Sequence, residues 1–129
     1  MTYEIDADVF ENRLYIDLNG RMDAEKIDEA ADVTIEKAER LDDGFDIVTD
    51  LSGFKPPSPE AAKPIKRAQE QLKEMGVDRV VRVTDDETSQ VVVNAFERRS
   101  RDVGYSGENA DSRDEAERML EEKEVAGYA

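Results

Sequence analysis

The sequence predicts a single α/β domain with a mixed sheet, in the element order β-β-α-β-α-β-α-β-α. Short apolar runs recur along the chain, and segments of helical periodicity separate most of them. The first two runs follow each other directly, which predicts an antiparallel hairpin at one edge of the sheet. The later runs alternate with helices, which predicts right-handed crossovers. A length of 129 residues fits one domain over residues 1–129.

The opening hairpin is predicted from two strands, over residues 3–10 and 14–18. Polarity alternates loosely in the first strand and strictly in the second, as it does in a strand with one buried face. Glu11 and Asn12 provide the turn between them. Asn19–Gly20 is expected to break the second strand.

A first helix is predicted to begin after Asp23, which suits the N-cap position. Its apolar residues recur at helical spacing, namely Ile27, Ala31, Ile35, Ala38 and Leu41. The helix is expected to end by Gly44. A buried strand over residues 45–51 follows it.

A second helix is predicted from about residue 59 to Met75, with Gly76 as its C-terminal cap. Pro64 would remove a backbone hydrogen bond inside this helix, so the helix either bends there or begins near Lys63. Residues 77–84 are expected to form the next strand.

The last third of the chain is predicted to hold a third helix over about residues 90–103 and a short edge strand over 105–110. Ser112 and Glu115 have the spacing of a capping box, which predicts a last helix. The tail is expected to fray from about residue 122.

The composition is strongly acidic, with 33 Asp and Glu residues, 18 Lys and Arg residues and a net charge of −15. Such a surface repels phosphate groups, so we expect no nucleic-acid partner. It is typical of proteins from a salt-rich cytoplasm, as in haloarchaea, where salt screens the self-repulsion. We therefore expect the melting temperature to fall in dilute buffer.

Cysteine and histidine are both absent from the chain. Disulfides, thiolate metal sites, the commonest general base and the commonest transition-metal ligand are thereby excluded. We expect no cofactor, no metal and no enzymatic activity. The chain has neither an apolar run of 18 residues nor a basic start followed by an apolar core, so we expect a cytoplasmic protein without a membrane span.

The candidate site is the loop after the central strand, because sites in open α/β sheets lie where strands end and helices begin. Asp50, Ser52 and Gly53 start this loop, through turn chemistry or as ligand contacts. Phe54 is expected to be exposed as an anchor for a partner, or else to fold back onto the core. Ser58 can cap the next helix or accept a phosphate at its N-terminus.

These residues carry a resemblance to a STAS domain, more narrowly to the SpoIIAA-like group, which is also similar to the lipid-binding Sec14 fold. The element order, the DLSG run at residues 50–53 and the close ENADSRDEAERMLEE at residues 108–122 carry it. The resemblance implies a module similar to anti-sigma-factor antagonists, which are switched by phosphorylation of a serine at the start of the helix after DLSG. Ser58 lies at roughly that distance. However, KPPSPEAA at residues 55–62 replaces the Asp-Ser-Ser-Gly run of the family, so the switch motif is not intact.

We therefore expect a non-enzymatic regulatory or protein-interaction module with a protein partner. The alternative is a carrier of a small apolar ligand or lipid, with a pocket between the sheet and the second and third helices. An exposed apolar patch near Phe54 favours the module, and a ligand-sized cavity lined by Ile65, Leu72, Val92 and Phe96 favours the carrier. The sequence leaves open whether the chain forms a homodimer.

Overall fold

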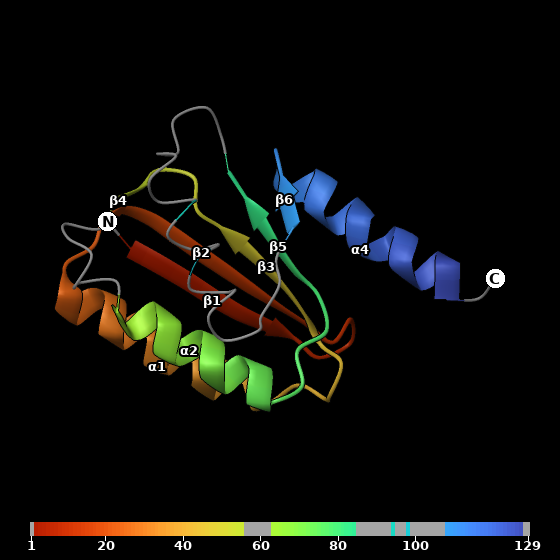
Figure 1. Ribbon diagram of the computed structural model, residues 1–129, viewed down its shortest axis with the longest axis horizontal. Helices are drawn as coiled ribbons and strands as arrows, with labels where there is room; N and C mark the ends of the chain where they lie inside the picture. The colour runs from red at the N-terminus through yellow and green to blue at the C-terminus, as the bar shows by residue number, and fades with distance from the viewer. Residues whose placement is uncertain (1, 56–62, 85–93, 95–97, 99–107, 128–129) are drawn as a thin grey trace.

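The structure is a computed structural model that describes residues 2–55, 63–84, 94, 98 and 108–127, with side chains from residue 3 to residue 121 of those ranges. The helices named within it are α1 (Ala24–Ala38), α2 (Lys63–Glu74) and α4 (Arg113–Gly127). α1 and α2 cover one face of a β-sheet, and α4 covers part of the other (Figure 1). The predicted α/β class is confirmed.

The sheet is mixed. The strands in the described residues are β1 (Thr2–Asp8), β2 (Arg13–Arg21), β3 (Asp46–Asp50), β4 (Phe54–Lys55), β5 (Val80–Val83) and β6 (Glu108–Ala110). Their order is β1-β2-β3-β5-β6, and β4 pairs with the end of β2. β1 runs antiparallel to β2, whereas the other pairs are parallel. The sheet therefore has the antiparallel edge that the sequence predicts.

Side-chain caps fix the starts of two helices as the sequence predicts. The carboxylate of Asp23 accepts a hydrogen bond of 2.9 Å from the backbone N–H of Lys26 at the start of α1. At the start of α4, the N–H of Glu115 donates to the Ser112 hydroxyl at 3.1 Å. The Glu115 carboxylate in turn accepts from the N–H of Asp111 at 3.1 Å, which closes the predicted capping box one residue earlier than the usual pattern.

The second strand does not end at Asn19–Gly20, and this prediction is wrong. β2 continues to Arg21, with Gly20 at φ +72°, a conformation that costs glycine little. The Gly20 N–H donates to the carbonyl of Gly53 at 2.9 Å, and β4 pairs with the extended end of β2. Two strands therefore stand between α1 and α2, where the sequence predicts one.

The remaining helix predictions have mixed outcomes. The described part of α2 runs from Lys63 to Glu74 and includes Pro64, while the predicted start near residue 59 lies outside the described residues. Gly76 follows α2 at φ +92°, as its predicted role as a cap requires.

The predicted third helix lies outside the described residues except for Asn94 and Arg98, which are helical. α4 continues to Gly127, past the point where fraying was expected.

Alternation along the strands divides the side chains between the two faces of the sheet. Leu14, Ile16 and Leu18 of β2 join the core beneath α1 and α2. A smaller core lies beneath α4 and consists of Val48, Val81, Val83, Ala110, Ala116 and Leu120. The α4 face carries charged residues over β1 and β2, among them Glu4 and Asp6, which are exposed.

Candidate functional site

The loop after β3 is built by turn chemistry, as one of its two readings predicts. The Asp50 carboxylate accepts a hydrogen bond of 2.9 Å from the N–H of Ser52. Gly53 has φ +76°, and a Cβ atom there would lie 3.3 Å from the side-chain oxygen of Asn19. The loop is therefore shaped to bring the chain back to β2.

Phe54 is buried, with 1% of its surface exposed, and belongs to the main core. Of the two predicted alternatives, an exposed anchor and a ring folded back onto the core, the second is confirmed, because the pairing of β4 with β2 turns the ring inward. Ser58, the predicted cap or phosphorylation site, lies outside the described residues.

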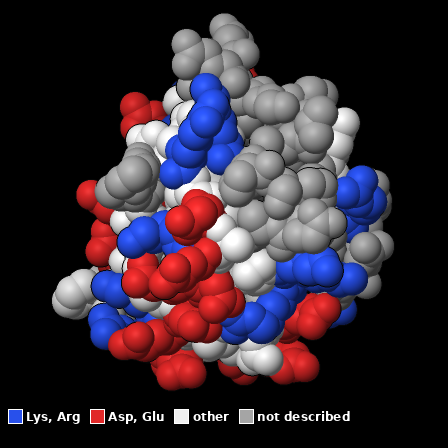
Figure 2. All heavy atoms as spheres, turned by 90° about the vertical axis from the view of Figure 1, so that its left-hand side faces the viewer, with Lys and Arg blue, Asp and Glu red and all other residues white. Residues whose placement is uncertain are grey.

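Figure 2 shows the side of the molecule where β2 ends, with Lys and Arg side chains lying among Asp and Glu side chains.

The large exposed hydrophobic residues of the described part lie at the other end of the sheet. Val9 is 62% exposed and Phe10 is 102% exposed. Both belong to the turn of residues 9–12 that joins β1 to β2, which we call the hairpin tip. β2, β3 and β5 run parallel, away from the tip and toward the loop after β3 (Figure 1). The candidate loop and the exposed apolar pair are thus separated by the length of the strands.

Asn12 fixes the hairpin tip to the connection between α1 and β3. Its side-chain amide donates to the carbonyl of Asp42 at 3.2 Å, and its side-chain oxygen accepts from the N–H of Asp42 at 2.8 Å. The Asn12 carbonyl accepts from the N–H of Asp46 at 3.2 Å. Asn12 has φ +53°, a left-handed conformation that asparagine adopts more readily than most residues. The side chain of Asn12 therefore fixes the position of the turn against the connection between α1 and β3, and its backbone conformation shapes the turn.

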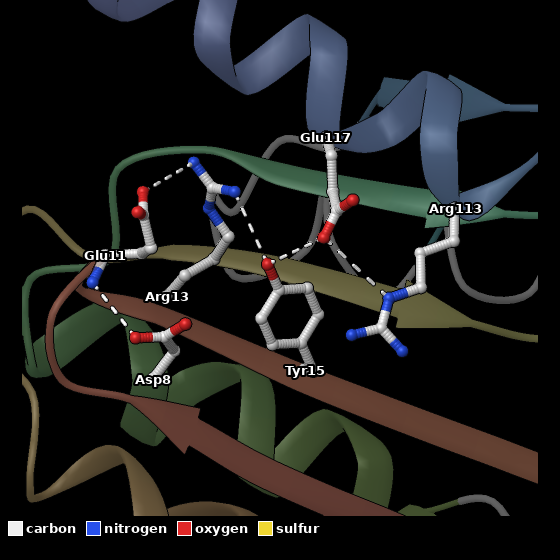
Figure 3. A network of polar contacts seen from close by, with 6 residues as sticks. All are labelled: Asp8, Glu11, Arg13, Tyr15, Arg113 and Glu117. Atoms are coloured by element: carbon white, nitrogen blue, oxygen red, sulfur yellow. Dashed lines mark hydrogen bonds and ion pairs between the residues drawn. The ribbon is translucent and has the colours of Figure 1, made fainter.

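A chain of polar contacts holds the other side of the hairpin tip (Figure 3). The N–H of Glu11 donates to the Asp8 carboxylate at 3.1 Å, and the Glu11 carboxylate lies 3.8 Å from the guanidinium of Arg13. Arg13 contacts the Tyr15 hydroxyl at 3.4 Å, and that hydroxyl donates to Glu117 of α4 at 3.0 Å. Burial raises the pKa of Tyr15, so the phenol stays protonated as a donor. The hairpin tip is thereby linked to α4 through Tyr15 and to the connection between α1 and β3 through Asn12.

Carboxylates flank the exposed apolar pair. Asp8 and Glu11 adjoin it in the sequence, and Asp42 and Asp43, both exposed, stand beside Asn12 in the neighbouring connection. Arg13, the nearest basic residue along the chain, is buried. The tip therefore presents an apolar centre with an acidic border.

A second polar cluster lies on the α4 face, where Asp17 of β2 stands beside Asp50 at the carboxyl end of β3. Glu4, Asp6, Asp17 and Asp50 line a cleft of about 40 Å³ together with Arg113. Burial, Asp50 and Glu4 raise the pKa of Asp17, and Arg113 opposes them. Within the described ranges, no group of three or more acidic side chains is placed to hold a metal ion.

The sequence interpretation missed the hairpin tip because it placed Val9 and Phe10 at the end of a strand. One signal was available. Tyr3, Ile5 and Ala7 alternate on one face of β1, whereas Val9 and Phe10 are consecutive apolar residues and cannot both continue that alternation. Consecutive apolar residues directly before a turn indicate that at least one of them faces solvent.

No family model and no curated protein matches this chain. Among the described residues, no helix is long and apolar enough to cross a membrane.

Proposed function

We propose that the chain is a non-enzymatic regulatory or protein-interaction module that docks its partner through the hairpin tip. The observation that carries this proposal is the complete exposure of Phe10 on a turn that is fixed from two sides. Full burial of such a side chain in a partner contributes about 1.5–3 kcal/mol. Aromatic residues are enriched in protein interfaces for this reason.

The fixed geometry of the tip makes the exposed ring an effective anchor. An interface loses affinity when binding must first order a loop. The bonds of Asn12 to Asp42 and of Glu11 to Asp8 already order this turn in the free protein. Binding therefore does not have to order the turn first, and the free energy gained by burying Phe10 contributes directly to affinity.

The partner that fits this surface is a protein with an apolar pocket bordered by Lys and Arg residues. The pocket receives Phe10, and its basic border faces Asp8, Glu11 and Asp42. Opposite charge at the border chiefly accelerates association and selects the partner. Salt weakens this contribution, while the apolar contact of Phe10 persists.

The STAS-like interpretation is consistent with this proposal at the level of fold class. The DLSG run serves the turn that leads from β3 to β4. Regulation through phosphorylation of Ser58 remains part of the proposal, and intact mass of protein from its native host tests it. The alternative, a lipid carrier, needs a pocket between the sheet and the second and third helices. Ile65 and Leu72 line a cavity of about 60 Å³ between the sheet, α1 and α2, whereas Val92 and Phe96, the other two residues named for that pocket, lie outside the described residues.

The test compares Phe10→Ser with Glu36→Ser, a control at an exposed position of α1. A partner selected by the wild-type protein is identified, purified and titrated against both variants by calorimetry in molar salt. We expect Phe10→Ser to weaken binding at least about tenfold, which corresponds to 1.4 kcal/mol, and Glu36→Ser to bind as the wild type does. Equal affinity of all three proteins for the partner contradicts the proposal.

A further inference from the structure

The outer edge of β1 is an open strand edge in the described part of the sheet. β1 stands at the end of the strand order, and its 7 residues pair with β2 on one side. α4 packs against β3, β5 and β6, toward the opposite edge (Figure 1). In an antiparallel pair, alternate residues direct both backbone groups to the partner strand, and the residues between them direct theirs outward. An edge of this length can therefore accept a further strand.

The two faces of β1 differ in their chemistry. On the side of α1, Ile5 is buried, and Tyr3 and Ala7 are half-buried against the main core. The residues between them point to the other face of the sheet, where Glu4 and Asp6 are exposed and line the cleft of the second polar cluster. A strand beside this edge therefore meets apolar side chains on one face and carboxylates on the other.

β1 is ordered before any partner binds. α1 packs against it, and the Tyr3 hydroxyl donates to the Glu29 carboxylate of α1 at 3.0 Å. The ammonium group of Lys26 lies 3.2 Å from the same carboxylate and so holds it in place. Pairing with this edge therefore requires the ordering of the incoming segment alone.

The carboxylates decide which strand can pair here. If a second copy of β1 paired with this edge about a twofold axis perpendicular to the sheet, the carboxylates of Glu4, Asp6 and Asp8 would stand opposite one another. Like charges at opposite cross-strand positions are destabilising, so the edge disfavours a second copy of this chain. Arg113 lines the cleft beside Glu4 and Asp6, but acidic residues outnumber it there. Basic side chains are thus the complementary cross-strand neighbours.

We propose that the outer edge of β1 binds an extended segment of a partner protein in which Lys or Arg alternates with apolar residues. The basic side chains lie beside Glu4 and Asp6, and the apolar ones lie beside Tyr3 and Ala7. The backbone of the segment pairs with the outward N–H and C=O groups of β1. Main-chain bonds then supply affinity, and the alternation supplies specificity. The edge is a separate surface from the hairpin tip, so this proposal does not depend on docking through Phe10.

The probe is an acetylated and amidated peptide of sequence Lys-Val-Lys-Thr-Lys-Val-Lys. A copy that is N-methylated at its central residues has the same charge and side chains but lacks the N–H groups for strand pairing. A second copy, Lys-Lys-Lys-Lys-Val-Val-Thr, has the same composition without the alternation. Each peptide is titrated into the full chain by NMR, at the lowest salt concentration that preserves the native spectrum, because salt screens the charge contacts. We expect the alternating peptide to bind with a Kd of about 0.1 mM and both copies to bind at least about tenfold more weakly.

Amide hydrogen exchange and two variants locate the binding surface. With the alternating peptide at about ten times its Kd, we expect alternate N–H groups of β1 to exchange about tenfold more slowly than in the free protein, because they then meet solvent only in unbound molecules. Asp6→Lys places a like charge beside the peptide and is expected to weaken binding at least about fivefold. Glu70→Lys makes the same charge change at an exposed position of α2 and is expected to alter the affinity less than about twofold.

Three results would overturn the proposal. Equal affinity for the N-methylated copy would show that charge alone attracts the probe. Protection confined to other strands, or no binding up to about 5 mM peptide, would show that the edge of β1 does not accept the segment. Equal effects of Asp6→Lys and Glu70→Lys would show that the peptide responds to the net charge of the protein and not to this edge.

Discussion

The two ends of the sheet place their aromatic residues in opposite environments. At the carboxyl end, the chain leaves β3 through an Asp50–Ser52 turn and returns as β4, which buries Phe54 in the core. At the amino end, the turn between β1 and β2 leaves Phe10 entirely in solvent. Hydrogen bonds fix the turns at both ends of the sheet. The difference between the two ends is therefore where each places its aromatic side chain. One end contributes its ring to folding, and the other has its ring available for a partner.

The largest effect is expected from the buried ring. Phe54→Ala removes a core side chain that is 1% exposed, and we expect the free energy of unfolding to fall by about 3–5 kcal/mol. Urea denaturation in molar salt measures this loss. Phe10→Ala is the matched change at the other end and is expected to alter the free energy of unfolding by less than about 0.5 kcal/mol. Similar losses in the two variants would remove the contrast between the ends.

A smaller effect is expected from the residue that fixes the hairpin tip. Asn12→Ala removes two side-chain hydrogen bonds to Asp42 and places alanine at φ +53°. We expect it to lower the free energy of unfolding by about 1–3 kcal/mol.

Asn12→Gly separates the two causes, because glycine tolerates the backbone conformation but makes no side-chain bond. It is expected to recover about 1 kcal/mol of the loss caused by alanine, and both values follow from the same denaturation curves. If the two variants are equally stable, the left-handed backbone of Asn12 carries no cost for alanine.

The smallest effect concerns charge at the carboxyl end. The pKa of Asp17 is raised above its ordinary 3.8 by burial, Asp50 and Glu4. The native state therefore binds a proton more tightly than the unfolded chain does, and stability falls as pH rises through this range. Asp17→Asn removes the penalty at neutral pH, and we expect a gain below about 1 kcal/mol because the group is only half-buried.

The gain from Asp17→Asn is expected to shrink as the pH is lowered through the raised pKa of Asp17 and to vanish below its ordinary value of 3.8, where the aspartic acid is protonated in both states. It also shrinks in molar salt, which screens the repulsion from Asp50 and Glu4. Thermal melts over a pH series measure both trends, with Glu36→Gln on the exposed side of α1 as the control. A gain that is independent of pH and salt would show that packing, and not charge, limits stability there.

Local signals in the sequence predicted those parts of the fold that local interactions decide. The caps at Asp23 and Ser112 and the left-handed Gly76 follow from the chemistry of one or two residues, and the structure has all three. The alternation of residues 14–18 also sufficed to place β2 and its inner face.

The features that the sequence did not predict depend on pairing between distant segments. Gly20 reads locally as a strand breaker, but β4 continues the pairing beside it. The same pairing decides between the two predicted positions of Phe54, because it turns the ring into the core. At the tip, the bonds from Asn12 to Asp42 span 30 residues, and no local pattern announces them. The candidate site was therefore predicted at the end of the sheet where the aromatic ring is buried.

The most direct test asks which end of the sheet touches a partner. A photo-crosslinking p-benzoylphenylalanine is placed at position 10 in one variant and at position 52 in another, and both are irradiated in cells of a salt-adapted host. We expect position 10 to form a covalent adduct with one defined protein, Val9→Ser to reduce the yield of that adduct, and position 52 not to form it. An adduct with the same protein from position 52 but not from position 10 would contradict the assignment of docking to the hairpin tip.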